Sequence, residues 1–142
     1  MPTRDGVSDR DWSVVKSLAL NIAKMSEQDA DTSDMERELH KYLDWLEQKY
    51  GEMPSILATR AEYTDNARDA VALYEKAYAS ACIIKCNYEK SYISLSIAEL
   101  YIVELKEVKA GKYWLRLLER NMNDFADNYI LEAYDTLRRK IA

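Results

Sequence analysis

The scarcity of glycine and proline limits this chain more than any other feature of its sequence. Among 142 residues there are only three glycines and two prolines. These residues most often interrupt helices and build the tight turns of hairpins, so a chain with so few of them favours long helices joined by short connections. No segment alternates apolar and polar residues strongly enough to compete with the helical patterns. The sequence therefore predicts an all-α fold.

Capping signals and apolar periodicity divide the chain into six or seven helices. Ser8 is a capping residue for a helix over 9–24, and Ser33 with Glu36 forms a capping box for a helix over 34–50. Pro54 suits the start of a short helix that ends near residue 62, because proline is favoured in the first helical turn. The remaining helices are expected from a cap at Thr64 or Asp65 to about 81, over 88–109 with Gly111 as the stop, around 113–118 and over 126–141.

Residues 57–81, LATRAEYTDNARDAVALYEKAYASA, resemble a tetratricopeptide helical hairpin. Ala70, Tyr74 and Ala77 fall at the spacing of the family's second-helix alanine, aromatic and alanine. The family's turn glycine and closing proline are absent, and no second copy follows. The resemblance implies hairpin packing and, by analogy, protein binding. The expected fold is thus a single domain over 1–142, either a compact irregular bundle or a short tetratricopeptide-like right-handed array.

Charge is unevenly distributed along the chain. The net charge is −5, and the first 71 residues hold 15 acidic and 9 basic side chains, against 10 and 11 in the rest. An acidic half attracts basic partners and repels phosphate, and the largest basic cluster is only 138–140, so no nucleic-acid partner is expected.

No apolar run is long enough for a membrane span, no signal peptide is evident, and two cysteines make no disulfide framework, which favours the cytoplasm.

The search for catalytic and metal-binding motifs predicts neither an enzyme nor a cofactor. A calcium loop beginning at Asp29 would have Asp34 where the turn glycine belongs and His40 where the bidentate glutamate belongs. One histidine excludes a carboxylate-bridged metal pair, and Cys82 with Cys86 lacks the second pair that a zinc site needs. No nucleophile is spaced with a base and an orienting residue.

The sequence leaves protein binding as the expected function. The specific hypothesis is a bacterial immunity protein or antitoxin whose acidic face plugs the active site of a basic toxin, such as a nuclease. Trp45, at the edge of the second helix, either packs on a neighbouring helix or contacts the partner. The expected contact residues are Asp29, Asp31, Asp34, Glu38, Tyr42, Asp44 and Trp45.

Two other hypotheses remain open. One is a tetratricopeptide-like scaffold or chaperone module that binds a peptide in a groove between helices. A groove for peptide carboxylates would draw on Lys85, Asn87, Lys90 and Arg116. The other is a structural homo-oligomer, because an acidic chain rich in aromatic residues could bury one face against a second copy.

Overall fold

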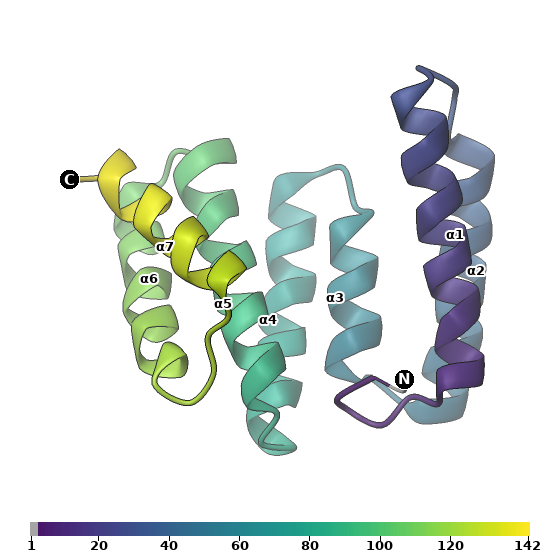
Figure 1. Cartoon of the computed structure of the whole chain (residues 1–142), viewed down its shortest axis with the longest axis horizontal. Helices are drawn as coiled ribbons and strands as arrows, with labels where there is room; N and C mark the ends of the chain where they lie inside the picture. Colours follow the sequence, from purple (N-terminus) through teal and green to yellow (C-terminus); the bar gives the residue numbers. More distant parts are fainter. Residues whose placement is uncertain (1–2) are drawn as a thin grey trace.

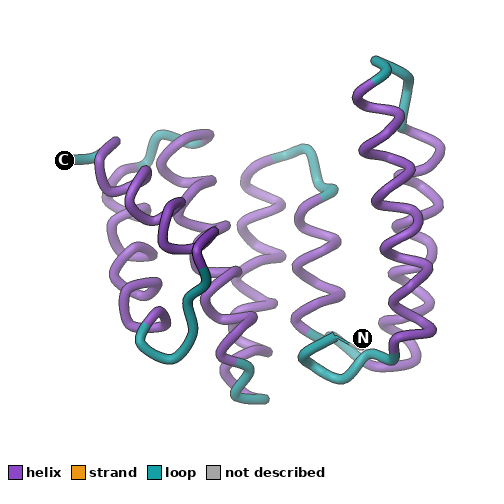
Figure 2. Tube along the Cα trace, viewed as in Figure 1, coloured by secondary structure: helices purple, strands orange, loops and turns teal. Residues whose placement is uncertain are grey.

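The computed structural model describes residues 3–142 and confirms the all-α fold (Figures 1 and 2). Over that range it contains seven α-helices, one short π-helical segment and no strand. In chain order the elements are α1 (Asp9–Glu27), α2 (Ser33–Tyr50), α3 (Pro54–Glu62), α4 (Ala67–Ile83), α5 (Asn87–Glu99), the π-helical η1 (Leu100–Glu104), α6 (Val108–Met122) and α7 (Asn128–Lys140).

Helices that follow one another in the chain pack side by side from α1 to α6, and α7 packs mainly on α5. The α1–α2 pair lies at one end of the molecule, α3 and α4 form a hairpin in the middle, and α5, α6 and α7 lie at the other end (Figure 1). The α3–α4 hairpin is the packing that the tetratricopeptide resemblance implied. The segment before α1 turns back onto α3, where the Asp5 carboxylate accepts hydrogen bonds from the Ser55 amide at 2.6 Å and the Ser55 hydroxyl at 2.8 Å.

The hydrophobic core is divided among these helix pairs. One cluster joins α1, α2 and the start of α3, a second joins α3, α4 and α5, and a third joins α5, η1, α6 and α7. Ala77 and Ala81 of α4 are fully buried, and these small side chains let neighbouring helices approach closely. Each helix is therefore stabilised mainly by its neighbours, as in helical arrays.

Most predicted helix starts agree with the structure, and two caps are wrong. The Ser8 hydroxyl accepts from the Asp11 amide at 3.1 Å, as predicted. The capping box of Ser33 is not formed, because Thr32 is the N-cap residue and Ser33 is already the first residue of α2. The Glu36 amide donates to the Thr32 carbonyl, and the amide and hydroxyl of Ser33 donate to the Asp31 carboxylate, at 3.0 and 2.6 Å. The fourth helix is capped by Asn66, whose side chain accepts from the Asp69 amide, and neither Thr64 nor Asp65 caps it.

The predicted helix over 88–109 is interrupted. The chain leaves α5 after Glu99, forms η1, turns at Lys106 with φ 56° and starts α6 at Val108. Gly111 lies within α6 and does not end a helix. A Cβ on Gly111 would be 2.4 Å from Cγ1 of Ile102, so the missing side chain lets α6 pack directly on η1. Apolar periodicity could not reveal this contact, because it joins two separate elements.

Candidate binding groove

The structure spreads the predicted carboxylates over several parts of the α1–α2 hairpin. Asp29 and Asp31 are exposed in the connection before α2, and Glu38 is exposed on α2 itself. Asp34 forms an ion pair with Arg37, and Asp44 forms one with Arg60 of α3 at 2.8 Å. Hydrogen bonds from Ser33 lower the pKa of Asp31. Three of these five carboxylates are thus already engaged within the protein.

Tyr42 and Trp45 are brought together on one flank of α2. Their ring centroids lie 5.4 Å apart in a stacked arrangement, and the Lys49 ammonium lies 5.2 Å from the Trp45 ring. The Tyr42 hydroxyl donates to the Asp11 carbonyl at 2.9 Å. Trp45 remains 47% exposed. It therefore stacks on its own helix and still presents nearly half of its surface to solvent, beside a cation.

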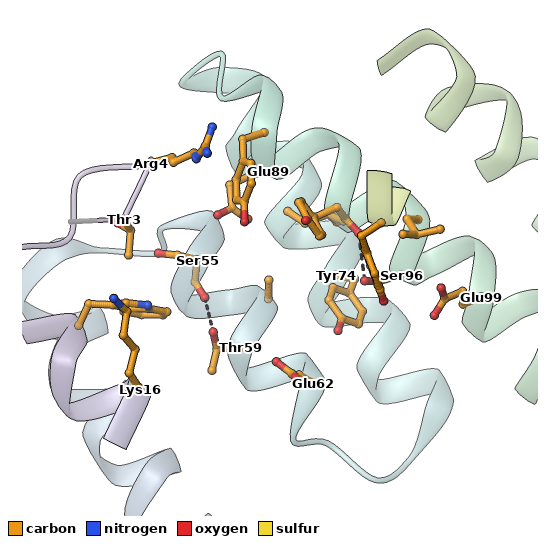
Figure 3. Close-up of a pocket in the computed structure, with 17 residues that line it drawn as sticks. Thr3, Arg4, Lys16, Ser55, Thr59, Glu62, Tyr74, Glu89, Ser96 and Glu99 are labelled. Carbon is orange, nitrogen blue, oxygen red and sulfur yellow. Dashed lines mark hydrogen bonds between the residues drawn. The ribbon is translucent and has the colours of Figure 1, made fainter. Parts of the chain in front are cut away.

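A groove of about 650 Å³ crosses the face formed by α1, α3, α5 and α7 (Figure 3). The N-terminal segment closes part of it with Arg4, and α4 contributes Tyr74. Four tyrosines and Trp12 line it, together with the carboxylates of Glu62, Glu89 and Glu99. The basic and amide residues suggested for a carboxylate-binding groove, Lys85, Asn87, Lys90 and Arg116, are not among the lining residues. The groove is therefore aromatic, and its three carboxylates outnumber its two lining cations, Arg4 and Lys16.

Helix α5 supplies most of the polar lining of this groove. Glu89, Tyr92, Ser96 and Glu99 follow one another at intervals of three, four and three residues, which places them on one face of the helix. Glu89 and Glu99 are separated by about 15 Å along the helix axis, at 1.5 Å per residue. The apolar character of the segment concealed these residues at the sequence level. Their regular spacing within it was the signal that could have revealed them.

Glu89 is the most deeply placed of the three carboxylates. Its side chain is 8% exposed, and among residues 3–142 no hydrogen bond or ion pair engages its carboxylate. Burial and, to a lesser extent, the negative charge of Asp5 raise its pKa to about 7, against the opposing influence of Arg4. Figure 3 places Arg4 and Glu89 toward one end of the groove. An unpaired, buried carboxylate of this kind is costly for folding, and such groups concentrate at functional sites.

Glu62 and Glu99 form the opposite part of the groove, on either side of Tyr74 (Figure 3). Desolvation raises the pKa of each, and within the described chain neither has an ion-pair partner. The charge of Glu99 raises the pKa of Tyr129, and burial together with Glu62 and Glu99 raises the pKa of Tyr74 to about 12. The mutual influence of these groups shows that negative charge and phenol rings share one small region.

Arg4 shows how a guanidinium fits the aromatic wall. Its Cζ atom lies 4.1 Å from the ring centroid of Tyr88 and 5.3 Å from that of Phe125. Cations are attracted to the faces of aromatic rings at such distances. The wall continues through Tyr92, whose ring stacks on Tyr129 with centroids 6.0 Å apart. Arg4 thus occupies the aromatic surface at one end of the groove, and the rings of Tyr92 and Tyr129 extend this aromatic surface past Arg4.

No protein-family model, curated protein or solved structure matches this chain. Across residues 3–142, no three His, Cys, Asp or Glu side chains are grouped closely enough to hold a metal ion. None of the described helices has the length and apolar character needed to cross a membrane. Function therefore has to be inferred from the groove itself.

Proposed function

We propose that this protein is a non-catalytic binding module that takes a basic segment of another protein into the groove. The observation that carries the proposal is the set of three carboxylates, Glu62, Glu89 and Glu99, which form no ion pair in the described chain and are bordered by tyrosine rings. A basic side chain would form an ion pair with a carboxylate while its stem or guanidinium packed on an aromatic ring. Both interactions favour lysine and arginine over neutral side chains.

The spacing of the three carboxylates along the groove favours an extended peptide as the ligand. The three glutamates are not grouped as a site for one ion, so several cationic groups on one chain would match them best. An extended peptide advances about 3.3–3.6 Å per residue. Two basic side chains four positions apart would therefore lie about 14 Å from each other, which is close to the separation of Glu89 and Glu99 along α5.

A toxin-neutralising role in the cytoplasm is the more specific form of this proposal. A nuclease or another toxin with a basic surface would offer the required lysines and arginines, and binding them would occlude a site built for phosphate. The exposed Trp45 surface of α2 is the second candidate contact, because a half-exposed indole is a common anchor of protein interfaces. A peptide-binding scaffold would use the same groove without a toxin partner.

The proposal can be tested by fluorescence polarisation with a labelled synthetic peptide that carries two lysines four positions apart in a glycine–serine background. We expect binding at low salt that weakens as salt is added, and no binding of the glutamate analogue. Glu62→Gln/Glu99→Gln should lower the affinity at least about tenfold. The matched control is Asp29→Asn/Glu38→Gln, which changes the net charge equally at two exposed positions in and before α2 that form no ion pair within residues 3–142, and it should bind as the unchanged protein does.

Three results would contradict the groove as the binding site. Absence of peptide binding to the unchanged protein would remove the proposal. Loss of affinity only in the control variant would show that the peptide binds the α2 surface around Trp45 and not the groove. Equal losses in both double variants would show that the peptide responds to overall charge alone.

A further inference from the structure

The groove continues into a second cavity of different chemistry. This cavity of about 440 Å³ shares Glu62, Tyr74, Ser96 and Glu99 with the groove and then extends between α3, α4, η1 and α7. Beyond the shared residues its walls are mainly aliphatic. The aliphatic residues are Ala61, Ala70, Leu100, Val103, Ala133 and Leu137, and the other four are Thr64, Glu104, Thr136 and Lys140.

Small side chains make this apolar extension possible. Ala61 of α3 and Ala70 of α4 are buried, and Ala133 of α7 is half-buried. These alanines leave space between helices that larger residues would fill. Val103 of η1 forms an exposed part of the lining. π-helical turns often occur at functional sites, and here η1 supplies both Val103 and Leu100 to the cavity.

We infer that the basic segment bound in the groove carries an apolar side chain, such as leucine or phenylalanine, next to its basic residues, and that this side chain enters the apolar extension. The inference rests on the proposed function, because the occupant is the same segment. Two observations connect the two sites. The extension begins at Glu62 and Glu99, which also line the groove, and Tyr74 and Ser96 line both cavities as well.

The charges that line the two cavities differ. Lys140 of α7 and Glu104 of η1 both line the extension beyond the shared residues, so one positive and one negative charge balance there. Glu89, at the far end of the groove, would instead favour a basic residue. The expected ligand therefore has a basic residue near Glu89, a second near Glu62 and Glu99, and an apolar residue after them.

The test compares three labelled peptides that share the two lysines. One ends in glycine beside the lysine pair, one has leucine on its C-terminal side, and one has leucine on its N-terminal side. Burial of a leucine side chain predicts that one of the two leucine peptides binds roughly tenfold or more tightly than the glycine peptide. Only one of the two leucine positions should increase the affinity, because the extension lies at one end of the groove.

Two valines provide a matched pair of variants. Val103 lines the extension and is 43% exposed, whereas Val108 is 42% exposed at the start of α6 and lies outside the cavity. Val103→Asn should remove most of the gain from leucine and leave the glycine peptide's affinity unchanged, and Val108→Asn should change neither. Ala133→Trp, which fills the extension, should likewise remove most of the gain in affinity from leucine and leave the affinity of the glycine peptide unchanged.

The possible failures of the two proposals are distinguishable. If the glycine peptide binds and depends on Glu62 and Glu99, but leucine adds nothing in either order, the proposed function stands and the apolar subsite is overturned. Equal losses in Val103→Asn and Val108→Asn would also overturn it. If the unchanged protein dimerises in sedimentation velocity and Val103→Asn abolishes the dimer, the occupant is a second copy of the chain, and the inference is wrong. If no peptide binds, the proposed function itself fails.

Discussion

The ionisation of Glu89 should lower the stability of this protein at neutral and alkaline pH. The side chain is 8% exposed and unpaired within the described chain, and burial raises its pKa from 4.5 to about 7. Each pH unit between these two values corresponds to about 1.4 kcal/mol, so the ionised carboxylate costs the folded state about 3 kcal/mol. That is a large share of the free energy of unfolding of an ordinary domain, which is about 5–15 kcal/mol.

The direction of the pH dependence follows from proton binding. Between pH 4.5 and about 7 the carboxylate of Glu89 is ionised in the unfolded chain and protonated in the folded one. The unfolded state then binds fewer protons, so this group's contribution to stability falls as the pH rises through that window. Below pH 4.5 both states are protonated and the cost is absent. Above pH 7 both are ionised and the cost is complete.

Glu89→Gln removes the charge and keeps the shape of the side chain. We expect the variant to exceed the unchanged protein in free energy of unfolding by about 3 kcal/mol at pH 8, with the difference shrinking toward zero near pH 4.5. Urea denaturation followed by circular dichroism at several pH values between 4.5 and 8 measures this difference. Other titrating groups cancel, because they are common to both proteins.

Glu132→Gln is the matched control, since Glu132 is exposed on α7. It should change the free energy of unfolding by less than about 0.5 kcal/mol at every pH. The reasoning would be refuted if Glu89→Gln were no more stable than the unchanged protein at pH 8. A gain that stayed constant from pH 4.5 to 8 would also refute it, because packing and not ionisation would then be the cause.

Three further substitutions test the packing. Asn121→Ala should lower the free energy of unfolding by about 2–3 kcal/mol in urea titrations. The reason is that the buried Asn121 amide donates to the Tyr78 hydroxyl at 3.1 Å and to the Ser94 hydroxyl at 3.3 Å. A cost below about 1 kcal/mol would contradict this role. Gly111→Ala should cost about 1–3 kcal/mol through overlap with Ile102, and the cost should disappear in an Ile102→Ala background if overlap is its cause. Trp45→Ala should lower the free energy of unfolding by less than about 1 kcal/mol, because the indole is nearly half exposed. A larger loss would show that the Trp45 side chain contributes to packing.

Helix positions could be predicted from the sequence where the determining interactions are local. The boundaries of α3 agree with the prediction from Pro54, and Ser8 caps α1 through its own hydroxyl. Both effects involve residues within one helical turn. The break after Glu99 was missed because its cause is not local. It depends on α6 packing against η1 at Gly111, and no pattern within 88–109 encodes that contact.

The helix ends also show how a chain poor in glycine terminates its helices. Asp29, Lys85 and Lys106 have φ values of 56–57°, in the left-handed region where glycine usually follows a helix. The next amide then bonds back into the helix, as from Ala30 to the Met25 carbonyl and from Cys86 to the Ala81 carbonyl, both at 2.9 Å. Lysine carries no signal for this conformation, so the ends of α4 and η1 could not be read from residue type.

The candidate site was missed for a different reason. Counting acidic residues drew attention to 29–44, where charges are frequent, but the sequence does not say which charges are paired. In the structure Asp34 and Asp44 form ion pairs, whereas Glu89 forms none within the described chain. Pairing depends on which helices become neighbours, and that is a property of the fold. Regular polar spacing within the apolar α5 is the more useful signal for such a groove.

A ligand that neutralises the groove should stabilise the protein more at alkaline than at acidic pH. The groove lies between α1, α3, α5 and α7, and the core residues Ile93 and Leu95 are among the residues that line it. A basic segment laid along it would contact several of these helices and compensate the ionised Glu89. At pH 8 that compensation is complete, and at pH 5 the protonated carboxylate offers little attraction. The rise in melting temperature caused by the two-lysine peptide should therefore be larger at pH 8 than at pH 5. Glu89→Gln should reduce this difference without abolishing it, because burial also raises the pKa of Glu62 and of Glu99. Equal rises in the unchanged protein would mean that Glu89 takes no part in binding.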